Sequence, residues 1–106
     1  MKTIKVKIHH DSIFMSILPK YFIATTIMRH ILVRKGYTFK PGVLNHELIH
    51  VCQWYRLGFF GFLFSYFIKD GFTPYKKKVL EAEAYANQAD EEYIQKTYPE
   101  FKLEVS

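Results

Sequence analysis

Residues 43–57, VLNHELIHVCQWYRL, are the stretch of sequence on which the rest of the fold depends. Pro41-Gly42 precedes this stretch and Gly58 follows it, and a glycine just beyond a helix is a common C-terminal stop. Apolar residues recur in it at the spacing of one helical face: Leu44, Leu48, Val51 or Cys52, and Tyr55. We therefore expect a helix over residues 43–57.

This helix carries the motif His46-Glu47-Leu48-Ile49-His50. Its two histidines are four residues apart, one turn along the same face, so both imidazoles can reach a single zinc ion. Glu47 points around the helix toward the open side of such a metal, where its carboxylate can take a proton from a zinc-bound water and pass it to a leaving amine. The alternative interpretation is an amphipathic helix with two ordinary histidines. The motif favours a hydrolytic zinc site with Glu47 as general base.

A catalytic zinc site normally has three protein ligands and one position for water, so a third ligand is needed. No histidine follows His50. Gln53 and Arg56 stand where a metzincin has a glycine and a third histidine, which excludes that class. A third ligand on the C-terminal side of His50 must therefore be a carboxylate or, less usually, a tyrosine, and the candidates are Glu81 and Glu83.

These two glutamates lie on a second expected helix, from Lys76 to about Lys96. The run is rich in alanine and glutamate, contains no Gly or Pro, follows Thr73-Pro74 and stops before Pro99. Glu81 and Glu83 are about 200° apart around such a helix, so only one of them can face the zinc. Without the first motif, the run would be interpreted as an ordinary solvated helix.

Two segments together resemble a known family. Leu44-Asn-His-Glu-Leu-Ile-His-Val-Cys-Gln53, followed about thirty residues later by Glu81-Ala-Glu-Ala-Tyr85, resembles the active-site helix and the glutamate helix of the gluzincins, in particular their minimal single-domain members, the minigluzincins. The resemblance covers about residues 27–90. It implies a zinc metallopeptidase acting on peptides or proteins, with Zn²⁺ as its cofactor, Glu47 as the catalytic residue, and His46, His50 and Glu81 as the metal ligands.

The resemblance also implies side chains that support the metal ligands from behind. In the wider family the glutamate helix has Glu-x-x-x-Asp, whose Asp supports a histidine ligand, and Tyr85 stands at that Asp position here. A ligating histidine normally gives its outer N–H to an oxygen acceptor, which a tyrosine supplies less strongly than a carboxylate. The alternative register takes Glu83 as the ligand and Asn87 as its support. Gln53, three residues beyond His50 and near its face, can steady the site.

The remaining sequence predicts an α+β fold in one zincin-like domain over residues 1–106. Residues 2–8 alternate polar and apolar, as a strand with one wet face does, and residues 13–18 are a second apolar stretch that Pro19 stops. A strand is expected near residues 27–34, where β-branched residues are frequent, preceded by either a short helix or more strand. We expect a small sheet of these N-terminal strands, packed on the active-site helix and the C-terminal glutamate helix.

The resemblance also suggests that the strand near Arg29–Arg34 is an edge that pairs with a bound peptide by strand addition. The tail after Pro99 alternates charged and apolar residues. It could lie along that edge, offer a carboxylate to the zinc, or form an ordinary final strand, and the last interpretation is the simplest.

Other conspicuous residues are expected to be structural. His30 is expected to be a surface or core histidine, with stabilisation of an oxyanion as the alternative, and His9 and His10 are expected to be solvated. Cys52 points away from the metal and should be a small buried apolar group. Core packing under the two helices, rather than a ligand pocket, is expected of Trp54, Tyr55 and the phenylalanines Phe59, Phe60, Phe62, Phe64 and Phe67.

Composition limits the compartment and the partners that can be expected of this protein. The 106 residues include one cysteine, so no intramolecular disulfide is available, and with no signal-peptide pattern at the start we expect a cytoplasmic protein. The apolar run at residues 57–68 is too short to cross a bilayer, although contact with a membrane surface stays open. The net charge of +5 and the cluster Lys76-Lys77-Lys78 come without a nucleic-acid-binding motif, so no nucleic acid partner is expected. The rival functions are a non-catalytic or latent zinc-binding module and, behind it, a basic nucleic-acid-binding domain.

Overall fold

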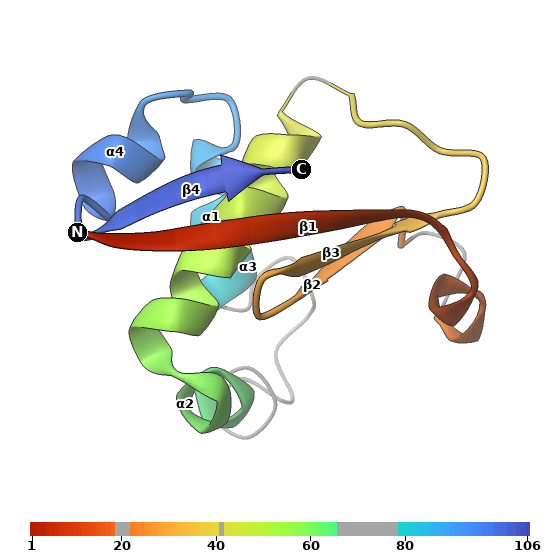
Figure 1. The fold of residues 1–106 in the computed structure, drawn as a ribbon, viewed down its shortest axis with the longest axis horizontal. Coiled ribbons are helices and arrows are strands. Elements are labelled where there is room, and N and C mark those ends of the chain that lie inside the picture. Colours follow the sequence, from red (N-terminus) through yellow and green to blue (C-terminus); the bar gives the residue numbers. More distant parts are fainter. Residues whose placement is uncertain (19–21, 41, 66–78) are drawn as a thin grey trace.

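The computed structural model of the chain describes residues 1–18, 22–40, 42–65 and 79–106. Its elements follow one another as β1 (Lys2–Ser12), the 3₁₀ helix η1 (Ile13–Ile17), β2 (Ala24–Ile27), β3 (His30–Arg34), α1 (Val43–Leu57), α2 (Phe59–Leu63), α3 (Val79–Asn87), α4 (Tyr93–Thr97) and β4 (Phe101–Val105). The strands form one mixed sheet with helices beside it (Figure 1), which confirms the predicted α+β class.

The sheet has the strand order β2-β3-β1-β4. β1 is parallel to both of its neighbours, with Ile8 opposite Ile31 of β3 and Ile4 opposite Leu103 of β4, while β2 and β3 are antiparallel. The predicted sheet of N-terminal strands is confirmed, and the C-terminal β4 joins it beside β1, a pairing that the sequence did not predict. Parallel partners lie far apart in sequence, so no local pattern records such a pairing.

The main core lies between this sheet and α1. Along β1, Ile4 and Val6 are buried while the lysines between and beside them are exposed, which is the period-two alternation expected of a half-buried strand. These residues form one apolar cluster with Ile31, Val33 and Val51, and Leu44, Leu48 and Tyr55 of α1 pack against it. The apolar stripe of the predicted helix is therefore the stripe that anchors α1 to the sheet.

α1 begins and ends where the sequence predicted. Gly42, at φ +87°, precedes it and its carbonyl accepts the first helical hydrogen bond, from the His46 N–H. Gly58, at φ +78°, ends it and donates its N–H to the Trp54 carbonyl. Both backbone conformations fall in the region that side chains other than glycine rarely adopt, so the two glycines fix the length of the helix.

Two strand predictions need correction. The strand expected near residues 27–34 begins only at His30, as β3. The segment before it is more strand, β2, which ends at Ile27 in a hairpin turn with Met28 at φ +54°. The apolar stretch at residues 13–18 forms the 3₁₀ helix η1 instead of extended structure. Neither the hairpin turn nor η1 contains a glycine that would have signalled it in the sequence.

The second predicted helix is broken into two. α3 ends at Asn87 and α4 begins at Tyr93. Polar side chains stabilise the break: the Asn87 amide donates to the Glu83 carbonyl, and the Asp90 carboxylate accepts from the Glu92 N–H. Asparagine and aspartate often compete in this way for backbone partners that a helix would otherwise use.

The prediction that the strand near residues 29–34 is a free edge for a peptide substrate is also wrong. The strand at residues 29–34 is β3, which is paired on both sides, by β2 and by β1. Of the described strands, the edges of the sheet are β2 and β4. The tail after Pro99 forms β4 against β1, at the edge opposite β2, so it is an ordinary final strand and does not lie along β2.

The aromatic residues divide into two groups. Trp54 and Phe62 are buried and stack with ring centroids 3.9 Å apart, while Tyr55 is partly buried. Phe59, Phe60 and Phe64 were predicted to be core but are exposed. The exposed fraction of Phe60 is 82%. α2 is only five residues long, too short to bury more than one side of its surface.

Some predictions concern residues outside the described ranges: Pro19, Pro41, Phe67, Thr73-Pro74, the lysine cluster at 76–78 and the start of the second helix. Within the described ranges, no helix has both the length and the apolar character that crossing a membrane requires.

Candidate metal centre

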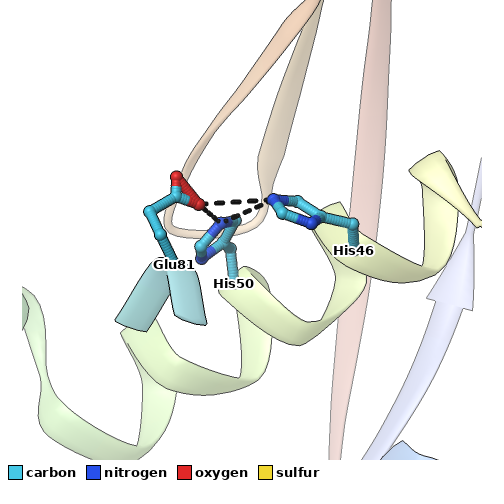
Figure 2. Close-up of side chains that lie close together, drawn as sticks. All are labelled: His46, His50 and Glu81. Carbon is cyan, nitrogen blue, oxygen red and sulfur yellow. Dashed lines mark hydrogen bonds and ion pairs between the residues drawn. The ribbon is translucent and has the colours of Figure 1, made fainter. Parts of the chain in front are cut away.

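His46 and His50 of α1 and Glu81 of α3 meet at one point (Figure 2). The His46 Nε2 and His50 Nε2 atoms are 3.2 Å apart, and Glu81 Oε1 lies 3.3 Å from the first and 2.5 Å from the second. All three side chains are buried. In the part of the chain that the structure describes, this is the one group of three or more His, Cys, Asp or Glu residues that could hold a metal ion.

The packing of α3 across α1 brings these residues together. The Gln53 side chain donates to the Leu80 carbonyl at the start of α3. At the other end, the Asn45 amide donates to the carbonyls of Asn87, Gln88 and Asp90, which holds the chain just after α3 against the first turn of α1. With α3 fastened at both ends, Glu81 faces the two histidines and Glu83 faces away from them.

Each histidine has a glutamine behind it. The Nδ1 atom of His46 lies 2.9 Å from Gln88 Oε1, and that of His50 lies 2.7 Å from Gln53 Oε1. An amide oxygen only accepts, so each Nδ1 carries a proton. Each Nε2 then faces Glu81, where it can give its lone pair to a metal ion or hold a second proton. Tyr85, which the sequence resemblance placed as a support for a histidine ligand, packs its ring edge-on against His46 with centroids 4.6 Å apart.

This arrangement fits a cation. Two imidazole lone pairs and a carboxylate oxygen converge on one buried point, which is an electron-rich site that a positive ion would neutralise. Two donors bound to one tetrahedral zinc ion lie about 3.3 Å apart, and two of the three separations here are 3.2 and 3.3 Å. The third, between His50 and Glu81, has the length of a strong hydrogen bond. The buried His–His–Glu group can hold a metal ion.

The same carboxylate raises the proton affinity of His50. Burial lowers the pKa of the His50 imidazole, but its hydrogen bond to Glu81 and the negative charges of Glu47 and Glu81 outweigh burial, so the net shift of the pKa is upward. Electrostatics at this site therefore favour positive charge, whether a proton or a metal ion supplies it.

Glu47 is buried beside the metal-ligating group without joining it. Its Oε2 atom lies 3.8 Å from His46 Nε2. Its Oε1 atom accepts a hydrogen bond of 2.8 Å from the Thr26 hydroxyl of β2. The Thr26 carbonyl in turn accepts from the Trp54 indole N–H, so β2 and α1 together fix the position of this carboxylate.

A cavity of about 730 Å³ opens next to these residues. Glu47, His50 and Glu81 form part of its wall, and most of the rest is apolar, including Phe14, Trp54 and Phe62. Trp54 and Phe62 therefore belong to the core, as predicted, and also line this cavity, which was not predicted. They pack against one another and also border the candidate site.

His9 and His30 also line the cavity. His9 is half-buried rather than solvated as predicted, and its Nε2 atom is hydrogen bonded to His30 Nδ1 at 2.9 Å. Burial, with the nearby charges of Arg29 and His9, lowers the pKa of His30. His10 is exposed, as expected, with its ring near Phe39.

Glu83, the alternative ligand, is turned to the other side of α3. Its carboxylate accepts from the Gln53 side-chain N–H at 3.0 Å and from the hydroxyls of Tyr93 and Tyr98 at 2.7 and 2.6 Å. The structure therefore brings Glu81, and not Glu83, to the histidines. Asn87, its proposed support in that register, bonds the backbone of α3.

Two residues of the site were not predicted. Gln88 lies seven positions after Glu81, two helical turns along the same face, so an extension of the periodicity past Tyr85 would have found it. Thr26 contacts Glu47 only because β2 packs beside α1, and no local pattern in the sequence indicates that contact.

Comparison of the chain with protein-family models, with curated proteins and with solved structures found no match. The chain is therefore assigned to no family, and its function is inferred from the site itself.

Proposed function

We propose that this protein is a zinc-dependent metallopeptidase with Glu47 as its general base. The observation that carries the proposal is that Glu47, His50 and Glu81 share one wall of a cavity large enough for part of a peptide. A site that only stored or structurally required a metal would gain nothing from a second buried carboxylate beside its ligands. His46, His50 and Glu81 would hold the ion, and their N, N, O donor set suits Zn²⁺.

A bound zinc ion would polarise the scissile carbonyl and make water a stronger acid. Glu47 would accept the proton of the attacking water and deliver it to the leaving amine. The hydrogen bond from Thr26 to Oε1 leaves Oε2, the oxygen nearer His46, as the base. Thr26 thus orients the carboxylate.

The cavity supports a peptide with large apolar side chains as the substrate. Apart from the metal site, its polar lining consists of His9, Thr25, Thr26 and His30. Strand addition at β2, the edge nearest Glu47, would be interrupted at Thr26, whose carbonyl is already bonded to Trp54. Side chains entering the cavity would therefore contribute more to binding than a backbone ladder would.

The single cysteine is compatible with a reducing compartment, and the proposal keeps the cytoplasm as the place of action. The Cys52 thiol is buried and is not in a disulfide.

The test compares the wild type with Glu47→Gln in a peptide-library cleavage assay with added Zn²⁺. Glutamine keeps the oxygen that accepts from Thr26 but cannot take a proton, so the variant should stay folded and bind about one zinc per chain. Its hydrolysis should fall by at least about 100-fold, the lower end of general-base catalysis. Zinc content and circular dichroism are the controls.

Equal cleavage by the two proteins would show that Glu47 is not the base. Zinc binding by both, with cleavage by neither, would leave the non-catalytic or latent zinc-binding module as the function.

A further inference from the structure

A line of hydrogen bonds runs from His50 away from the cavity. Gln53, which is almost completely buried, contacts His50 Nδ1 with its Oε1 atom at 2.7 Å. Its Nε2 atom donates to the Leu80 carbonyl at 2.9 Å and to Glu83 Oε1 at 3.0 Å. The line therefore joins His50 to Glu83 through one amide.

The partners of this amide decide which way it points. A backbone carbonyl and a carboxylate can only accept hydrogen bonds, so the end of Gln53 that faces Leu80 and Glu83 must be the NH₂ group. The oxygen end then faces His50. Because an amide oxygen cannot donate, His50 must place its proton on Nδ1, and its Nε2 lone pair is left for the metal site.

Glu83 is itself held in place from the other side. Its Oε2 atom accepts from Tyr93 of α4 and from Tyr98, the residue that follows α4. Burial, together with the Glu83 carboxylate, raises the pKa of the Tyr98 hydroxyl above its ordinary value, so this hydroxyl remains a donor. Three donors from three parts of the chain thus fix one carboxylate.

We infer that Glu83 is a positioning residue that acts through Gln53 to hold His50 in the tautomer that presents its Nε2 lone pair to the metal site. The inference rests on the metal-binding part of the proposed function and is independent of peptide hydrolysis. It gives Glu83 a role that neither a zinc ligand nor a solvated helix residue would have. His46 has a separate partner, Gln88, so Glu83 affects only one of the two histidines.

Zinc affinity, measured by competition with a chelator, provides the first test. Glu83→Leu removes one of the two acceptors that hold the Gln53 NH₂ group, the other being the Leu80 carbonyl. The variant should weaken zinc binding about 10- to 100-fold, the usual effect of losing a partner behind a ligand. Glu83→Gln should restore most of the affinity, because its oxygen can accept from Gln53 while the tyrosine hydroxyls rotate to accept from its NH₂. Glu81→Gln is the matched comparison, and it should weaken binding by more than Glu83→Leu does.

Proton NMR of the zinc-loaded protein provides a second readout that a merely structural role would not change. In the wild type, the Nδ1–H protons of His46 and His50 should both exchange slowly with water. In Glu83→Leu the His50 signal should broaden or disappear while the His46 signal stays. Should Glu83→Leu fail to fold, Gln53→Leu replaces it with the same expectation, since it removes the acceptor of the His50 proton directly.

The results separate this inference from the proposal on which it rests. A wild type that binds no zinc overturns both. A wild type that binds zinc, with Glu83→Leu folded and unchanged in affinity and in the His50 signal, overturns only the role of Glu83. An equal loss of affinity in Glu83→Gln and Glu81→Gln would also overturn it, because Glu83 would then act through its charge, as a ligand does.

Discussion

The two buried faces of α1 are packed in opposite ways. The face toward the sheet is apolar, and Leu44, Leu48 and Val51 contact the cluster around Ile31. The face toward α3 is polar, and His46, His50 and Gln53 meet Glu81 and Glu83 there. Among the described residues, every buried side-chain nitrogen or oxygen has a hydrogen-bond partner, so the polar face is complete and not a packing defect.

The difference shows which face stabilises the fold and which is kept for chemistry. Burying apolar surface is favourable by about 25 cal/mol per Å². Burying paired charges and imidazoles often contributes nothing net, because desolvation offsets the attraction between the groups. Leucines on the polar face would hold α3 as well as the histidines and glutamates do. The polar residues are therefore expected to act on an ion, and changes to the two faces should have separable effects.

The largest expected effect belongs to the apolar face. Ile31→Ala removes a fully buried side chain from the cluster under α1 and should lower the free energy of unfolding by about 2–5 kcal/mol. Urea denaturation measures the loss. The matched control, Ile13→Ala, is at a side chain that is 79% exposed, and it should change stability by no more than about 0.5 kcal/mol.

If the two faces of α1 are independent, the Ile31→Ala protein that remains folded should bind as much zinc as the wild type. Loss of zinc from a folded Ile31→Ala would show that the two faces are not separable.

The next effect belongs to the polar face. Zinc at about 100 times its dissociation constant should stabilise the protein by about 2.7 kcal/mol and raise the melting temperature by roughly 10 °C, because the ion binds only the folded state. A chelator should reverse the shift. Thermal denaturation with and without zinc measures it, and the double variant His46→Ala, His50→Ala is the control that should not respond. A melting temperature that zinc raises equally in the double variant would place the ion elsewhere.

The contrast between the faces also separates what the sequence could predict from what it could not. The bounds of α1 were predictable because Gly42 and Gly58 end it locally, and His46, Glu47 and His50 were predictable because their spacing is fixed by the helix that carries them. Glu81 could be chosen over Glu83 only through a resemblance, since the choice depends on how α3 rotates against α1.

Features that depend on distant contacts were missed. The pairing of β4 with β1 joins the two ends of the chain, and the contact of Thr26 with Glu47 depends on where β2 packs. The hairpin turn after Ile27 has neither the Asn-Gly nor the Asp-Gly pair that usually marks one. The break after Asn87 did have a local signal, the Asn and Asp side chains that bond the backbone there.

The smallest expected effect concerns Cys52, a fully buried residue of α1. Burial, with a smaller contribution from the Glu100 charge, raises the pKa of its thiol to about 12. An unfolded cysteine has a pKa of about 8.5. Because only the thiolate reacts, alkylation of the native protein at pH 8 should be almost undetectable and should appear only as urea unfolds the chain.

The raised pKa of Cys52 also makes the stability of the fold depend on pH. The folded state holds its thiol proton more tightly than the unfolded state, so the contribution to stability is complete below about pH 8.5 and is lost as the pH rises toward 12. Alkylation also sharpens the comparison, since removing zinc with a chelator should leave the native labelling rate unchanged if the thiol belongs to the apolar packing. Rapid labelling of the folded, zinc-free protein, with protection on adding zinc, would instead make Cys52 part of the metal face and would contradict the division of α1 into two independent sides.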